Sequence, residues 1–250
     1  MKIKQLLISL PKVERCTNIM MKEIRTVVVS VRFMVAVILF CVCLITANLL
    51  ECKVIDVFGL SLTAGLLVFP ISYILNDCIV EVWGYKLARL TIWLGFGVNL
   101  FVMLLMQMAR ILPSPEYWEH GAEFDFVFGF GLRIVLASMV AYLFGSFSNA
   151  FFMSRMKRKT KGRHFSVRAI ASTVLGESLD SLFFFPIAFA GVMPMGKLLE
   201  MMLLQALIKS AYEMAALPVT VLVVKRLKKK ENTDVIDGDL SYSPFRFTDI

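Results

Sequence analysis

Acidic side chains recur in the apolar stretches of this sequence, at spacings that put them on common helix faces. Glu177 and Asp180 are three residues apart in "GESLDS", and Asp77 and Glu81 are four apart, directly after Asn76. Residues three or four apart are neighbours on the surface of a helix. Inside a bilayer each charged side chain costs from about 2.5 to more than 10 kcal/mol, so such acids usually mark a path for a solute or an ion. We therefore expect them to face the interior of a helix bundle.

A third polar stripe combines a base with an acid. Gln205, Lys209 and Glu213 follow one another at four-residue intervals in an otherwise apolar stretch. Lys209 and Glu213 could alternatively form a structural pair between helices, and Arg133 could snorkel outward. The acids in these stretches outnumber Arg133 and Lys209 by three. Some carboxylates must therefore be protonated, or must hold a cation or a donor-rich ligand. Both outcomes favour transport, with protons as a candidate coupling ion.

Other polar positions also allow a structural interpretation. Glu81 precedes Trp83 and Tyr85, which are typical of the aromatic belt at a membrane interface. Glu177 and Asp180 differ, because they lie near the middle of their stretch and have no route to the interface. Hydrogen bonding between helices would explain a set of amides, those of Asn48, Asn99 and Asn149.

The elements that must position these residues are membrane-spanning helices. Of the 250 residues, 58% are hydrophobic and 18% are charged, whereas soluble domains are about 45–50% apolar. A helix needs about 20 apolar residues to cross a bilayer. The fold class is therefore an all-α integral membrane protein with about six spans, expected at 27–50, 60–80, 88–111, 127–153, 169–192 and 198–224.

The distribution of positive charge predicts the orientation. Lys and Arg gather in a leader at 1–26, in alternate connections and in the tail at 228–250, which leaves 27–227 as the transporter domain. Because such clusters stay on the cytoplasmic side, we expect both termini in the cytoplasm. The net charge of +8 thus reflects topology and predicts no nucleic-acid partner. The tail, which is polar and lacks a helical period, is expected to be flexible.

Prolines indicate where the bundle opens. Pro70, Pro186 and Pro218 lie within the second, fifth and sixth expected spans, which also carry the polar stripes. Each removes a backbone hydrogen bond and should free the carbonyl four residues earlier, namely those of Leu66, Leu182 and Met214. We expect the cavity among these three spans. A 3+3 inverted repeat remains open, supported by Asn48 and Asn149 at equivalent places.

Catalytic and metal-binding patterns are weak. His120 and His164 lie in connections without an HExxH motif, and the five cysteines form no CxxC pair. We expect no catalytic residue, no metal site and no cofactor. One enzymatic alternative stays open, an intramembrane aspartyl pair of Asp77 and Asp180.

The motifs "FPISYILNDCIVEVWGYKLAR", "VLGESLDSLFFFPIAF", "QALIKSAYEMAALP" and "DVID", in this order, resemble the queuosine precursor transporter family, also described as vitamin-uptake-like transporters. The resemblance covers 32–237. It implies a multi-pass protein of the cytoplasmic (inner) membrane that imports 7-cyano-7-deazaguanine and 7-aminomethyl-7-deazaguanine for queuosine modification of tRNA, with queuine as another candidate. Positions matching the family's polar motif residues are Asn48, Lys53, Asn76, Asp77, Glu81, Gly84, Tyr85, Asn149, Glu177, Asp180, Gln205, Lys209 and Glu213.

The implied ligand suits the polar stripes. A deazaguanine presents N1–H and a 2-amino group as parallel donors, which one carboxylate can accept, and its O6 could accept from Lys209, Gln205 or an Asn. Phe69, Tyr73 and the run 183–185 could supply aromatic walls. The predicted substrate site comprises Glu177, Asp180, Asp77, Asn76, Gln205, Lys209, Glu213, Asn48, Asn149, Glu81 and Tyr73. The substrate-binding subunit of an ATP-driven vitamin importer is the main alternative, although the first span lacks the AxxxA surface expected of one.

Overall fold

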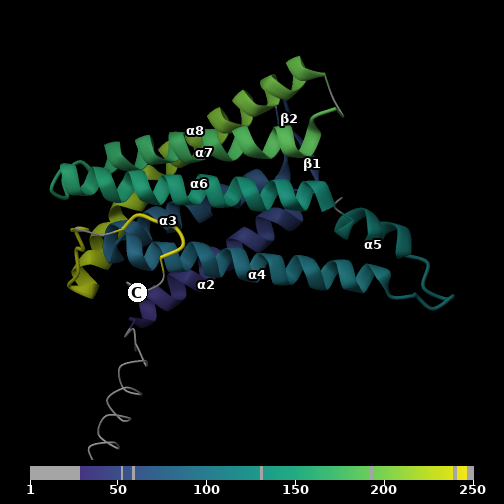
Figure 1. Ribbon diagram of the computed structural model, residues 1–250, viewed down its shortest axis with the longest axis horizontal. Coiled ribbons are helices and arrows are strands. Elements are labelled where there is room, and N and C mark those ends of the chain that lie inside the picture. Colours follow the sequence, from purple (N-terminus) through teal and green to yellow (C-terminus); the bar gives the residue numbers. More distant parts are fainter. Residues whose placement is uncertain are drawn as a thin grey trace, which may run out of the picture.

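The computed structural model describes residues 29–51, 53–57, 60–129, 132–191, 194–238 and 241–246 (Figure 1). Six of its helical segments are long and apolar enough to cross a membrane. The prediction of an all-α membrane fold with about six spans is thus confirmed. These segments are α2 (Val31–Leu50), η2 (Ala64–Leu67) continuing into α3 (Phe69–Trp83), α4 (Tyr85–Ile111), α6 (Leu132–Lys159), α7 (Phe165–Phe189) and α8 (Met195–Glu231).

A short β-hairpin occupies part of the expected second span. Strands β1 (Val54–Val57) and β2 (Leu60–Thr63) pair antiparallel, with Val54 opposite Thr63. The expected start of that span at residue 60 is therefore wrong, since its helical part begins at Ala64. The physical reason is the alternation in "LSLT", which suits a strand as well as it suits the end of an apolar run.

Two other details differ from expectation. Helix α6, which forms the fourth span, begins at Leu132 rather than at residue 127, after a separate short helix, α5 (Gly121–Phe128). Pro70 lies in the first turn of α3, where a missing N–H removes no helical hydrogen bond. The expectation that it frees a carbonyl is therefore wrong. Pro186 and Pro218 do lie inside α7 and α8.

Helix α3 is the centre of the bundle. It packs against α2, α4, α6 and α8, and about two thirds of its span is buried, so its polar side chains face protein rather than lipid. Beside it, α6 and α7 run side by side (Figure 1). Their backbones approach closely at two glycines, because a Cβ on Gly145 would lie 3.1 Å from the carbonyl oxygen of Gly176.

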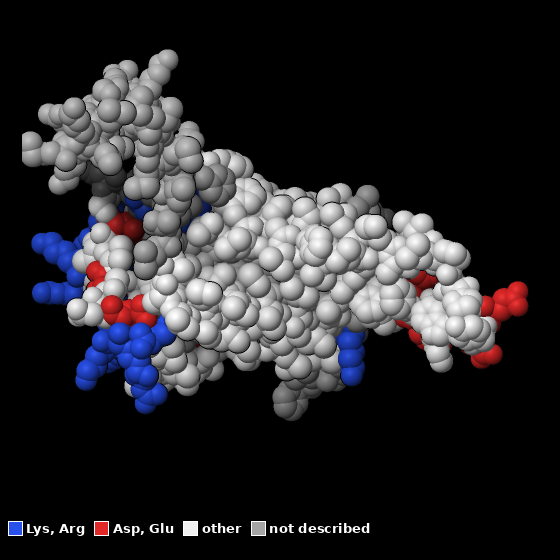
Figure 2. Space-filling view, turned by 90° about the horizontal axis from the view of Figure 1, so that it is seen from below, with Lys and Arg blue, Asp and Glu red and all other residues white. Residues whose placement is uncertain are grey.

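The two ends of the bundle differ in charge. Arg32 near the start of α2 forms a 2.8 Å ion pair with Glu231 at the end of α8, so both helix ends lie at one end of the bundle. Figure 2 shows most of the visible Lys and Arg at one end, together with some acidic residues, a largely uncharged surface along the middle, and acidic residues at the opposite end. The uncharged middle is what a bilayer would cover.

The C-terminal segment after α8 packs against the bundle, so the expectation of a flexible tail is wrong for its described residues. It crosses the junction of α3 and α4, where Gly84 adopts a φ of +85° that L residues rarely take. Asp237 is buried there and accepts a hydrogen bond from the backbone N–H of Tyr85 at 3.1 Å. Further hydrogen bonds reach the segment from α4: Arg89 to the carbonyls of Ser241 and Ser243, and Trp93 to that of Pro244.

Candidate functional site

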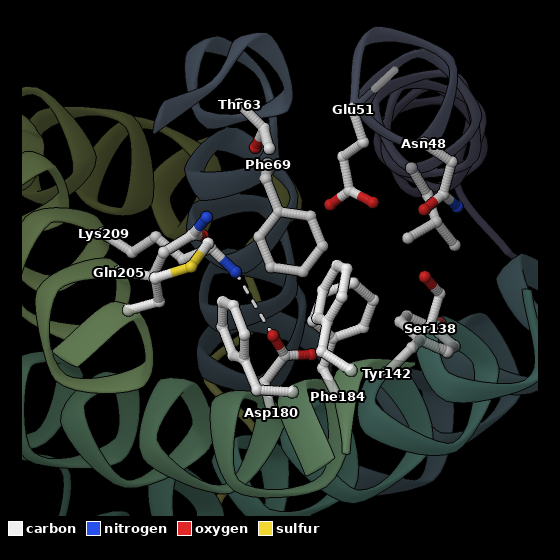
Figure 3. A pocket seen from close by; sticks show the side chains of 14 residues that line it. Asn48, Glu51, Thr63, Phe69, Ser138, Tyr142, Asp180, Phe184, Gln205 and Lys209 are labelled. Carbon is white, nitrogen blue, oxygen red and sulfur yellow. Dashed lines mark hydrogen bonds and ion pairs between the residues drawn. The ribbon is translucent and has the colours of Figure 1, made fainter. Parts of the chain in front are cut away.

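A cavity of about 110 Å³ lies in the half of the bundle that carries the hairpin (Figure 3). A single water needs at least roughly 10–15 Å³, so this cavity has room for several water-sized groups. Its lining residues come from α2, β2, α3, α6, α7 and α8: Leu44, Asn48, Glu51, Thr63, Phe69, Ser138, Tyr142, Asp180, Phe184, Phe185, Phe189, Met201, Gln205 and Lys209.

The charged centre of this cavity is Lys209. Its Nζ donates to Oδ2 of Asp180 at 3.2 Å and lies 3.3 Å from Oε2 of Glu177. The ammonium also lies 3.8 Å from the ring centre of Phe69, within the range of a cation–π contact. All three charged side chains are buried, so each needs a counter-charge to remain ionised. The single positive charge of Lys209 cannot balance two ionised carboxylates.

Glu51 adds a carboxylate that sequence analysis missed. It caps the end of α2, and its side chain points into the cavity (Figure 3). Burial raises the pKa of Glu51 to about 7, opposed by nearby Lys209 and reinforced by Asp180. A charged residue at the end of a span is ordinary, so the position of Glu51 in the sequence gave no sign of a role. Its spacing of three from Asn48 was the available signal, because both side chains face the cavity.

Two side-chain amides, those of Asn48 and Gln205, line the cavity. Asn48 donates to Oδ1 of Asn99 at 2.9 Å, which joins α2 to α4 as the structural interpretation predicted. Gln205 lies on α8 one turn from Lys209 and lines the cavity. Aromatic side chains form much of the remaining wall, including Phe184 and Phe185, whereas Phe183 stacks on Phe144.

A second set of buried polar side chains, here named the deep polar group, comprises Tyr73, Asn76, Asp77, Asn149, Thr173 and Glu213. Tyr73 closely approaches the Gly145–Gly176 contact of α6 and α7. Asn149 lies beside Asp77 without good hydrogen-bond geometry, and neither Asp77 oxygen has a partner among the described residues. An unsatisfied buried polar atom costs about 1–3 kcal/mol. Such a group therefore calls for a ligand or a proton.

Glu81 belongs to neither set. Its carboxylate receives two hydrogen bonds from Arg168, at 2.7 and 3.0 Å, and an ion pair from Lys228. Lys157 lies 3.9 Å from the same carboxylate and 2.6 Å from Asp234. Burial alone would raise the pKa of Asp234, but hydrogen bonds from Lys157 and Lys228 leave it below its ordinary value. We name Glu81, Lys157, Arg168, Lys228 and Asp234 the charged cluster.

The predicted site residues therefore fall into three places along the bundle. Four line the cavity and Glu177 lies beside it; five belong to the deep polar group; Glu81 lies in the charged cluster. The cavity residues are Asn48, Asp180, Gln205 and Lys209, and the deep ones are Tyr73, Asn76, Asp77, Asn149 and Glu213. The side chain of Arg133 lies outside the described part of the chain.

The sequence is similar to known transporters. A protein of Bacillus subtilis named "Probable queuosine precursor transporter" is 26% identical over 190 residues, which are 76% of this chain and 83% of that protein. The "Queuosine precursor transporter" of Escherichia coli is 29% identical over 144 residues, covering 58% of this chain and 62% of that protein. No solved structure matches the chain. Residues 63–223 match the family described as "Putative vitamin uptake transporter". That match covers more than half of the chain, which therefore belongs to this family of multi-pass membrane transporters.

Proposed function

We propose that the chain is a secondary transporter that imports 7-deazaguanine precursors of queuosine across the cytoplasmic (inner) membrane. The names of its relatives support this substrate class. The observation that carries the proposal is the buried arrangement of Lys209 with Asp180 and Glu177 beside an aromatic-walled cavity. It offers a donor and acceptors within one apolar enclosure, which is what a flat, polar-edged base needs.

The chemistry of the base fits this arrangement. Asp180 or Glu177 would accept the paired donors N1–H and 2-amino, and Lys209 or Gln205 would donate to O6. Phe69 and Phe184 would contact the ring faces.

The direction of entry follows from charge. If the Lys- and Arg-rich end faces the cytoplasm, the cavity lies in the outer half of the membrane and the charged cluster lies at the inner end. Substrate would then enter from outside. The charged cluster would close the inner end until the bundle rearranges.

Protons are the coupling ion that best suits the deep polar group. Asp77 and Glu213 are buried, and each has a carboxylate oxygen without a hydrogen-bond partner among the described residues. A carboxylate in such surroundings is stable when protonated and costly when ionised. Release of that proton to the inner side would then be linked to the change of state that delivers the substrate.

A complementation experiment tests the function. Cells that cannot make 7-deazaguanine precursors and that lack a transporter of their own should regain queuosine in tRNA when this chain is expressed and a precursor is supplied at low concentration. An empty vector is the negative control, and the exposed-loop variant Glu116→Gln is the matched positive control. Absence of queuosine despite verified membrane abundance would refute the proposal.

A further inference from the structure

The cavity has more acidic groups than its lysine can neutralise. Lys209 lies within ion-pair distance of both Glu177 and Asp180. Within the described ranges, no Lys, Arg or His nitrogen comes within 4.0 Å of the Glu51 carboxylate, which lines the same cavity. Three carboxylates thus share one cation. A neutral ligand would leave the third carboxylate without a counter-charge, whereas a cationic ligand would supply one.

Glu51 also lies at a distinct side of the cavity. In Figure 3 its carboxylate enters from the α2 side, across the open space from Asp180 and its bond to Lys209. A ligand held by its polar edge at Asp180 would therefore extend its other side toward Glu51. On a deazaguanine, the group at position 7 projects from the five-membered ring, whereas N1–H and the 2-amino group belong to the six-membered ring.

We propose that Glu51 binds a protonated amine carried at position 7 of the base, so that this chain favours 7-aminomethyl-type deazaguanines over the neutral 7-cyano compound. The inference rests on the proposed function and deepens it. An alkylammonium brings a positive charge and N–H donors to the carboxylate. A nitrile brings only an acceptor, which an ionised carboxylate repels.

The surroundings of Glu51 support this role. Burial raises the pKa of its carboxyl to about 7, so an ionised Glu51 is poorly solvated and gains from a bound cation. The charged groups around it are Lys209 from α8 and Asp180 from α7, with Glu177 beside Lys209. The neutral polar ones that line the same cavity are Asn48 from α2, Thr63 from β2, Ser138 and Tyr142 from α6, and Gln205 from α8. None of these other than Lys209 is a cation.

Gly65 lies against the Glu51 side chain. A Cβ on Gly65 would lie 2.6 Å from Cγ of Glu51 and 3.0 Å from the carbonyl oxygen of Ala47. The glycine therefore allows η2 to approach the end of α2 beside the Glu51 side chain. Gly65→Ala should displace the Glu51 side chain without changing its charge, which provides a second, independent variant.

The test compares uptake of two labelled compounds, 7-aminomethyl-7-deazaguanine and 7-cyano-7-deazaguanine, by cells expressing the chain at matched membrane abundance. For the wild-type chain and Glu116→Gln we expect a lower KM for the aminomethyl compound. Glu51→Gln should raise that KM about ten-fold or more, in line with loss of a charge-assisted hydrogen bond. The KM for the cyano compound should change by less than the KM for the aminomethyl compound, and the matched membrane abundance reports correct folding of the variant. Gly65→Ala should also raise the ratio of the KM for the aminomethyl compound to the KM for the cyano compound.

The outcomes separate two failures. If the wild-type chain takes up neither compound, the proposed function itself is wrong. If it takes up both with the same KM, or if Glu51→Gln weakens both equally, transport stands and the amine-binding role of Glu51 is overturned.

Discussion

The guanidinium of Arg168 donates two hydrogen bonds to the carboxylate of Glu81, at 2.7 and 3.0 Å, and both side chains are fully buried. This bidentate pair joins α7 to the centre of the bundle in α3. Lys228 of α8 forms an ion pair with the same carboxylate. Three helices that carry the polar stripes are thus tied together at the end opposite the cavity.

Removing Glu81 should therefore destabilise the protein strongly. In Glu81→Leu, the buried Arg168 keeps only carbonyl and sulfur acceptors, whereas Lys157 and Lys228 keep Asp234. An uncompensated buried charge costs about 3–5 kcal/mol. Adding Arg168→Met should recover part of this loss. Unfolding of the purified variants in detergent measures both effects, with exposed Glu200→Gln as control; a double variant less stable than Glu81→Leu would contradict the interpretation.

The C-terminal segment should contribute to stability through Asp237. Its carboxylate accepts the first N–H of α4, a helix-terminal donor that lacks an intrahelical partner. Asp237→Ala leaves this N–H buried and unsatisfied, at a cost of about 1–3 kcal/mol. The segment should also become more accessible to protease. Limited proteolysis measures this accessibility through the loss of a C-terminal tag, with Glu119→Ala as the control. Equal cleavage of both variants would argue against the described packing.

The membrane spans could be predicted from the sequence, because a run of about twenty apolar residues has the length of a helix that crosses a bilayer. Contacts between residues far apart in the sequence could not be predicted in this way. Asp237 and Tyr85 are 152 positions apart, and a polar tail gives no sign that α4 supplies donors for it. The strand at 60–63 was misassigned because four apolar and hydroxyl residues carry no periodicity long enough to separate strand from helix.

The site was predicted in composition but not in arrangement. Spacing along one helix identifies residues on a common face. It therefore predicted that Glu177 and Asp180 share one face and that Lys209 belongs to a polar stripe. Spacing does not tell which stripes meet at the same depth. Asp77 and Glu81 share a face of α3, yet one turn of helix separates the deep polar group from the charged cluster. Glu51 was missed because only the fold brings the end of α2 over the cavity.

Topology provides a direct prediction. The end of the bundle with Lys157, Arg168 and Lys228 should face the cytoplasm, and the connection around His120 should face outward, because Lys- and Arg-rich connections are retained inside. A reporter fused to the C-terminus should read cytoplasmic, and one inserted near His120 should read external. The opposite pattern would place the cavity in the inner half and reverse the proposed direction of entry.

Substrate preference should depend on pH through Glu51. With a pKa of about 7, its carboxyl is mostly protonated at pH 6 and mostly ionised at pH 8, whereas an aliphatic amine stays protonated below about pH 10. The preference for the aminomethyl over the cyano compound should therefore grow as the external pH rises from 6 to 8. In Glu51→Gln, the preference between the two compounds should not change with external pH. A wild-type ratio that falls over this range would contradict the assignment.

Lys209 and Glu177 should be required for uptake of every deazaguanine. Glu177→Gln exchanges an acceptor oxygen for a donor, which would oppose the donors of the base; losing a charge-assisted hydrogen bond of about 1.5–3 kcal/mol weakens binding roughly ten-fold or more. Lys209→Met removes the donor to O6 and leaves two buried carboxylates without their shared cation. Both variants should lose uptake at matched membrane abundance, whereas Glu116→Gln in the exposed loop should behave like the wild type. Normal transport by both cavity variants would mean that these buried charges hold the helices together and that the substrate binds elsewhere.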